Sequence, residues 1–239
     1  MRFPVTSAQF GASEAPTPIP IQPHLAAGLR PRGLRVHAIG PLRVGLGRLP
    51  LQSLGGAKAG AHQALALFAF LFDRGMQGVE KDEATEVIWP DASLPVADTA
   101  FHRTLLGLRG SLRAGGFGDA AVEFHNGRYV LASGLISWAD TWEVERMVNA
   151  SASTADLQAR IELLEQCRRL NQADYMDDCP FFGNSVYVEG RRSMLRAVRQ
   201  AVLAELAGLY RAAGHLALGA IRSAEADAVG ELLPIDGPA

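Results

Sequence analysis

The chain has 239 residues, of which 48% are hydrophobic and 20% are charged, a balance typical of a soluble globular protein. No apolar run approaches the roughly 18 residues that a membrane span needs, and we expect no secretory signal at the N-terminus. Residues 34–136 carry ten Lys and Arg against nine Asp and Glu, whereas residues 137–239 carry ten against fifteen. This distribution excludes a strongly basic stripe, the usual electrostatic mark of a nucleic-acid-binding protein.

The polar and sulfur-containing residues do not form the pattern of an enzyme or a metal site. Cys167 and Cys179 lie twelve positions apart without a CxxC pair, and the histidines do not cluster. A zinc site needs closer spacing and more ligands, so we expect no metal and no cofactor. The chain also lacks a Ser-His-Asp, Cys-His or HExxH arrangement, so we expect no enzyme. Free thiols favour a cytoplasmic protein.

The chain opens with a segment of unusual composition. Residues 1–33 contain six of the thirteen prolines and little apolar surface, which predicts a disordered tail. Residues 34–52 differ, because apolar residues alternate there and Gly40 and Gly47 interrupt them. This pattern predicts two or three short antiparallel strands.

Two helices are predicted next. Residues 61–75 have a broad apolar face that must be buried, and Gly75 is expected to end this helix. Residues 79–90 predict a shorter helix, with Asp82 as its N-cap and Pro90 at its end.

The stretch "FHRTLLGLRGSLRAGG", residues 101–116, predicts a third helix, which is amphipathic. Its core-facing stripe is formed by Phe101, Leu105, Leu108 and Leu112. Further on, "AVEFH" and "RYVLA" flank Asn126-Gly127, the strongest short-range signal for a β-hairpin. Strands, three helices and a hairpin in this order predict an α+β winged helix over residues 34–136.

From Ser137 onward the apolar spacing is helical throughout. Two long segments on either side of Gly214 predict an αα-hairpin of the kind found in tetratricopeptide-like helical domains. We therefore expect an all-α domain over residues 137–239, with a boundary near 133–140.

Two charged groups in this second half are given structural interpretations. The adjacent acids Asp177 and Asp178 are interpreted as part of a loop that caps a helix or carries surface charge. The "GRR" of residues 190–192 is interpreted as the solvated start of a helix, able to pair with those acids.

Several short motifs resemble a known family when they are taken in order. The segments "LRVHAIGPLRV", "VIWPD", "LLGLRGSLRAGG" and "GRYVL" are similar to the OmpR-like winged helix that opens the SARP-type bacterial transcriptional regulators. The later "SWADTWEVERMV" and "LLEQCRRLNQADYMDDCPFF" are similar to the bacterial transcriptional activator domain that follows it. The resemblance covers about residues 34–238. It implies a DNA-binding winged helix whose third helix enters the major groove.

The resemblance and the helical wheel together give a set of candidate DNA contacts. Arg103 lies on the outward face and is the first candidate for a base or phosphate contact. Thr99, near the expected helix start, is a candidate for a phosphate, together with the helix N-terminus. Arg109 borders the core stripe, so a phosphate contact and an internal ion pair are both open. The further candidates are Lys58, His102, Leu106, Arg113 and, beside the hairpin turn, Arg128.

Two functions remain open at this stage. The first is a transcriptional regulator that reads promoter DNA, with RNA polymerase or a second copy of the chain as partners of its helical domain. The second is a winged-helix protein-interaction module that has lost DNA readout. Leu106 and Gly107 favour the second, because the family tends to have polar or basic residues there, and leucine cannot form a bidentate hydrogen bond to guanine.

Overall fold

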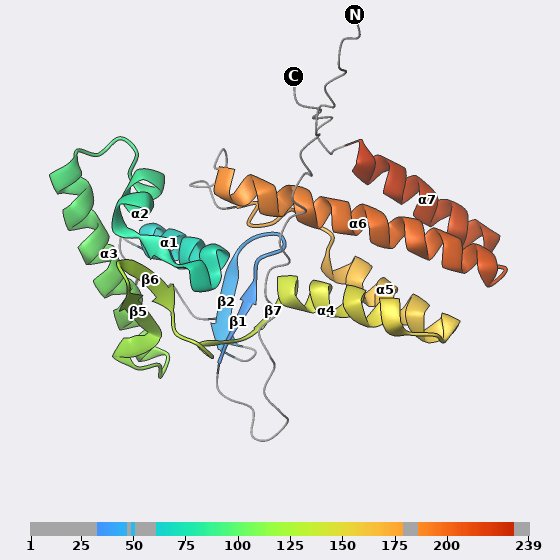
Figure 1. Cartoon of the computed structure of the whole chain (residues 1–239), viewed down its shortest axis with the longest axis horizontal. Helices are drawn as coiled ribbons and strands as arrows, with labels where there is room; N and C mark the ends of the chain where they lie inside the picture. The colour runs from blue at the N-terminus through green and yellow to red at the C-terminus, as the bar shows by residue number, and fades with distance from the viewer. Residues whose placement is uncertain (1–32, 47–48, 51–60, 179–185, 232–239) are drawn as a thin grey trace, which may run out of the picture. The chain divides into compact units, whose positions relative to one another are not determined.

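The computed structural model describes residues 33–46, 49–50, 61–178 and 186–231, which belong to one compact unit. The predicted disordered tail lies outside these residues, as do Lys58 and Cys179. The fold is an α+β winged helix followed by a helical part (Figure 1). The division at residues 136 and 137 remains a prediction.

The first sheet is built from both ends of the winged helix. Strands β1 (Leu34–His37), β2 (Arg43–Leu46) and β3 (Leu49–Pro50) pair antiparallel, which confirms the strands predicted there. A fourth strand, β7 (Ile136–Ala139), pairs parallel with β1, so the helix predicted from Ser137 is wrong for its first residues. The reason is a long-range partner that the local pattern cannot show.

The predicted helix in residues 61–75 is confirmed as α1 (Ala61–Arg74). Gly75 follows it with φ 52°, a left-handed conformation that favours glycine after a helix. The helix α2 (Lys81–Ile88) starts with a capping box, in which the side chain of Glu80 accepts from the N3 backbone. The prediction of Asp82 as N-cap is therefore wrong.

The third helix, α3 (Leu94–Ala114), begins well before Phe101. Ser93 is its N-cap residue, and Pro95 lies in its first turn, where proline is tolerated because that N–H has no helical partner. The predicted core stripe is confirmed. Its members Phe101, Leu105, Leu108 and Leu112 are each at most 4% exposed.

The two faces of α3 predict very different responses to truncation. Leu105→Ala should lower the free energy of unfolding by roughly 2–5 kcal/mol, because it removes a buried leucine and leaves a cavity. Arg103→Ala should lower it by less than about 0.5 kcal/mol, because Arg103 is exposed. Urea denaturation of both variants measures the difference, and equal losses would show that the helix is turned the other way.

The predicted hairpin is confirmed by β5 (Val122–His125) and β6 (Arg128–Leu131). Asn126 and Gly127 have φ values of 51° and 82°, as a two-residue type I′ turn requires. The short strand β4 (Val79–Glu80) adds to β6, which makes a three-stranded sheet. The hairpin is therefore tied to the start of α2.

The helical part consists of two helix pairs. In the second pair, two long helices run side by side on either side of Gly214, whose φ is 81°, so the predicted αα-hairpin is confirmed (Figure 1). None of the described helices combines the length and apolarity that a membrane crossing requires. The four helices are α4 (Asp140–Ser153), α5 (Leu157–Leu170), α6 (Val186–Ala212) and α7 (Leu216–Gly230).

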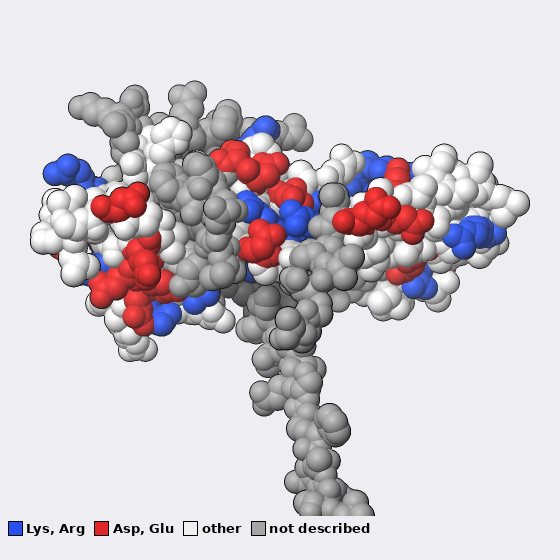
Figure 2. All heavy atoms as spheres, turned by 90° about the horizontal axis from the view of Figure 1, so that it is seen from above, with Lys and Arg blue, Asp and Glu red and all other residues white. Residues whose placement is uncertain are grey.

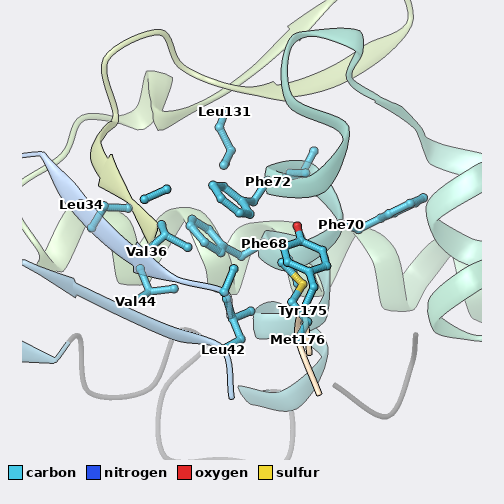
Figure 3. Close-up of a cluster of buried hydrophobic side chains, with 14 of the residues drawn as sticks. Leu34, Val36, Leu42, Val44, Phe68, Phe70, Phe72, Leu131, Tyr175 and Met176 are labelled. Atoms are coloured by element: carbon cyan, nitrogen blue, oxygen red, sulfur yellow. The ribbon is translucent and has the colours of Figure 1, made fainter. Parts of the chain in front are cut away.

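The segment of residues 171–178 joins the first sheet to the helical part. The N–H of Gly40 donates to the carbonyl of Asp174 at 2.7 Å, and the N–H of Met176 donates to the carbonyl of Ala38 at 2.7 Å. Tyr175 and Met176 are buried, and their side chains enter the same cluster as residues of α1 and the strands (Figure 3). This segment is therefore part of the core.

Arginines at the start of α6 hold this segment from its other side. Arg192 is only 8% exposed and donates to the carbonyls of Tyr175 and Met176, at 2.9 and 3.0 Å. Arg191 lies 3.8 Å from a carboxylate oxygen of Asp73 in α1. The interpretation of residues 190–192 as a solvated helix start is therefore wrong for these two side chains.

The acids expected to pair with those arginines act elsewhere. Asp177 and Asp178 are both exposed, and a carboxylate oxygen of Asp178 accepts from the N–H of Leu42 at 2.8 Å. The described part of the chain shows no ion pair between either acid and Arg191 or Arg192. Asp178 therefore caps the backbone before β2 and not a helix.

A buried carboxylate at the start of α4 makes a second connection to the first sheet. Asp140 is 2% exposed and accepts from the N–H groups of Ala38, Ile39 and Thr141 at 2.8–3.0 Å. Burial raises the pKa of Asp140 above its ordinary value, although these hydrogen bonds favour the ionised form. The carboxylate thus joins residues far apart in the sequence.

Candidate nucleic-acid interface

The outward face of α3 is the surface on which the sequence placed most of its candidate contacts. Thr99, His102, Arg103, Leu106 and Arg113 are all exposed, as the helical wheel predicts. They lie on the opposite side from the buried stripe, because residues at i, i+4, i+7 and i+11 share one face. The helix therefore presents these side chains outside the core.

Among these exposed residues, Arg103 is the one cation with no internal partner. It makes no hydrogen bond or ion pair to any other residue in the part of the chain that the structure describes. His102 differs, because its Nδ1 lies 2.8 Å from the carbonyl oxygen of Asp98 and 3.5 Å from the carboxylate of the same residue. Arg103 is thus free to meet an external acceptor.

Thr99 does not lie where it was expected. Because α3 begins at Leu94, Thr99 falls beyond the first turn, where the free N–H groups of a helix are found. Its hydroxyl donates to the carbonyl of Pro95 at 2.9 Å. The structure therefore separates Thr99 from the helix N-terminus with which it was expected to act.

Arg109 is partly buried and serves the internal structure. Its guanidinium donates to the carbonyl of Val122 at 2.7 Å, which fastens α3 to β5. The open choice between phosphate contact and internal ion pair thus has a third answer, an internal hydrogen bond. A guanidinium held in this way is poorly placed for an external ligand.

The other two arginines of the predicted interface form ion pairs. Arg113 pairs with Asp119, with its Nε 2.7 Å from a carboxylate oxygen. Arg128 pairs with Glu80 at 2.6 Å and also donates to the carbonyl of Gly78 at 3.3 Å. Pairs between exposed groups contribute only about 0–1 kcal/mol, so phosphates can compete for both arginines.

The recognition helix and the hairpin pack against each other through aromatic rings. The ring centroids of Phe101 and Tyr129 lie 5.1 Å apart, and those of Phe124 and Tyr129 lie 4.7 Å apart. Such contacts, with the Arg109 hydrogen bond, hold the two elements in one arrangement. Because helix and hairpin are fixed together, they can meet two neighbouring parts of one ligand.

The surface charge around these elements is mixed. On the face of the molecule seen in Figure 2, Lys and Arg side chains are scattered among Asp and Glu. Lys81 in α2, for example, lies 2.5 Å from Asp98 in α3, which neutralises it. The charge on this face therefore gives little non-specific attraction to a polyanion.

Sequence reasoning missed two exposed apolar residues at the start of α3. Leu94 is 83% exposed and Val96 is 59% exposed. They were missed because the helix was expected to begin near Phe101. The signal was present, since Ser93 followed by Pro95 is the pattern of an N-cap and a first-turn proline.

The comparisons with known proteins bear on the fold. No protein-family model matches the chain, and no curated protein matches it. A solved structure, Mycobacterium tuberculosis EmbR in complex with a low-affinity phosphopeptide, matches with a TM-score of 0.51 and 17% sequence identity. The match covers 83% of this chain and 55% of that chain, so this chain spans about half the length of EmbR. At this identity the likeness shows a common fold, an N-terminal winged helix followed by a helical part.

Proposed function

We propose that the protein is a DNA-binding transcriptional regulator of the SARP type. Its α3 enters the major groove of promoter DNA, and its hairpin contacts the neighbouring backbone or minor groove. The observation that carries this proposal is the free guanidinium of Arg103 on the outward face of a helix locked to a hairpin. The resemblance of the sequence to that family and the fold shared with EmbR support it.

The arginines divide the work within this proposal. Arg103 contacts base edges, because it lies where a recognition helix faces the groove and has no internal partner. Arg128 and Arg113 contact phosphates by exchanging exposed carboxylate partners for them. Arg109 is left to hold the helix against the hairpin. Affinity therefore depends on few cations, and the salt dependence should be shallow.

The helical part is proposed to contact RNA polymerase or a second copy of the chain. The helix α7 has exposed apolar side chains that a partner can cover, namely Leu216, Leu218 and Ile221. A weak DNA contact by one winged helix gains from such a partner, because linked sites raise the effective concentration.

A protein-interaction module is the second candidate function. The exposed apolar side chains of Leu94, Val96, Leu106 and Phe124 favour it, because contiguous apolar surface is typical of protein interfaces. The internal partners of Arg109, Arg113 and Arg128 favour it too. This module would bind a protein partner through α3 and would not bind DNA.

A salt-titrated binding series separates the two functions. The wild-type chain is tested on fragments of the source genome and on random DNA from about 50 to 200 mM salt. Arg128→Ala should weaken specific and random binding alike and lower the salt slope by about one. Arg103→Ala should cost about 1–3 kcal/mol on the preferred fragment and much less on random DNA.

Arg211→Ala is the control, because Arg211 is an exposed arginine of α6 far along the chain from the interface. It should leave both affinities unchanged. The absence of any binding by the wild type at about 50 mM salt would reject the DNA proposal in favour of the protein-interaction module.

A further inference from the structure

The outward face of α3 carries two glycines that the fold itself does not require. Gly107 and Gly110 lie in the interior of the helix, and neither has a positive φ. A Cβ built on either residue would meet no atom within 4 Å. Backbone conformation and internal packing therefore both allow alanine at these positions.

Glycine inside a helix is unfavourable, because it loses more conformational freedom on folding than alanine does. What it offers is the absence of a side chain, which lets another molecule approach the backbone closely. Two such positions one turn apart, beside the exposed Leu106, indicate a face against which a ligand fits tightly.

The side chains that remain on this face offer limited chemistry. Arg103 is the one unpartnered cation among them, and the hydroxyl of Thr99 already donates to its own helix. Leu106 is 69% exposed and wholly apolar. In the major groove, an arginine fork matches guanine, and an apolar side chain matches the 5-methyl group of thymine.

Helix geometry places these two contacts close together on DNA. Three residues rise about 4.5 Å along a helix, and adjacent base pairs stack about 3.4 Å apart. Arg103 and Leu106 therefore reach base pairs one or two steps apart.

We infer that α3 reads a guanine one or two base pairs from a thymine, with Arg103 on the guanine and Leu106 on the thymine methyl group. Gly107 and Gly110 let the helix lie close against the base edges at this point. The inference rests on the proposed DNA-binding function and names the DNA element that the site recognises. The protein thus selects by methyl contact where its helix lacks further hydrogen-bonding groups.

The first experiment removes the methyl group from the DNA. The full chain is used to select duplexes from a randomised library, and the enriched duplex is made again with deoxyuridine in place of thymidine. Wild type should bind the deoxyuridine duplex about fourfold more weakly for each methyl group that it contacts. Leu106→Ala should bind both duplexes equally. Leu94→Ala is the matched control, an exposed leucine on another face of the same helix, and should keep the difference.

The second experiment fills the bare face of the helix. Gly110→Ala should raise Tm by about 2–4 °C, because alanine is the better helix former, yet weaken binding to the enriched duplex about tenfold or more. Gly208→Ala is the matched control, since Gly208 lies in α6 with equal open space around it. It should raise Tm similarly and leave DNA binding unchanged.

The outcomes separate the inference from the function on which it rests. If wild type enriches no duplex, the proposed function and the inference fall together. If wild type enriches a sequence but binds its thymidine and deoxyuridine forms equally, the inference is wrong and the DNA-binding function stands. Unchanged DNA affinity of Gly110→Ala would likewise overturn the close approach of α3.

Discussion

Asp140→Ala is expected to lower the free energy of unfolding by about 3 kcal/mol or more. The substitution leaves the N–H groups of Ala38, Ile39 and Thr141 without the acceptor that they share. Each buried donor left without a partner costs about 1–3 kcal/mol, and the lost contacts lie between β1 and α4. Urea denaturation measures the loss.

Asp140→Asn provides the graded comparison, because it keeps one acceptor oxygen and should lose less stability than alanine. Asp227→Ala is the control, since Asp227 is an exposed acid of α7, and its replacement should change stability by less than about 0.5 kcal/mol. Equal effects of Asp140→Ala and Asp227→Ala would mean that these hydrogen bonds contribute nothing to the fold.

Arg192→Met is expected to lower the free energy of unfolding by about 2–4 kcal/mol. Methionine keeps part of the apolar stem but leaves the carbonyls of Tyr175 and Met176 without the guanidinium that now donates to them. Hydrogen bonds to a charged group contribute about 1.5–3 kcal/mol each, and the retained stem limits the loss of packing. The effect should concentrate in residues 171–178.

Amide hydrogen exchange locates that effect. In Arg192→Met, the N–H groups of Gly40 and Met176 should exchange faster than in wild type, because their bonds hold the segment to the first sheet. Arg211→Ala, a substitution at an exposed arginine of the same helix, should leave both rates unchanged. Uniform faster exchange across the chain would point to global destabilisation and not to a local role of Arg192.

These two substitutions test how the winged helix is connected to the helical part. Asp140 binds the backbone that follows β1, and Arg192 clamps a segment whose Tyr175 and Met176 side chains enter the same core as α1. A partner that binds the helical part therefore acts on a segment packed against the winged helix. The coupling between them is a physical contact and not a flexible tether.

Much of the winged helix follows from local pattern. The stripe that includes Phe101 and Leu112 is buried as expected, because spacing at 3.6 residues per turn places it on one side of α3. Asn126-Gly127 forms the expected turn, since both residues tolerate positive φ. The exposure of Arg103 and Leu106 could also be read from the helical wheel.

The partners of the charged side chains could not be read in this way. Arg103 and Arg128 are similar in the sequence, yet one is free and the other pairs with Glu80, which lies far away along the chain. Such pairs depend on strands that meet only in the folded protein. The candidate site was therefore predicted as a surface, and its one free guanidinium was not.

By itself, the sequence determined the elements whose signals are local: the core stripe of α3, the hairpin turn and the helix pair around Gly214. Only the tertiary structure decided the parallel pairing of β7 with β1, the burial of Asp140 and Arg192, and the entry of Tyr175 into the core. The physical reason is the range of the interactions. Periodicity and turn chemistry act over a few residues, whereas a buried charge or an added strand depends on partners that are distant in the chain.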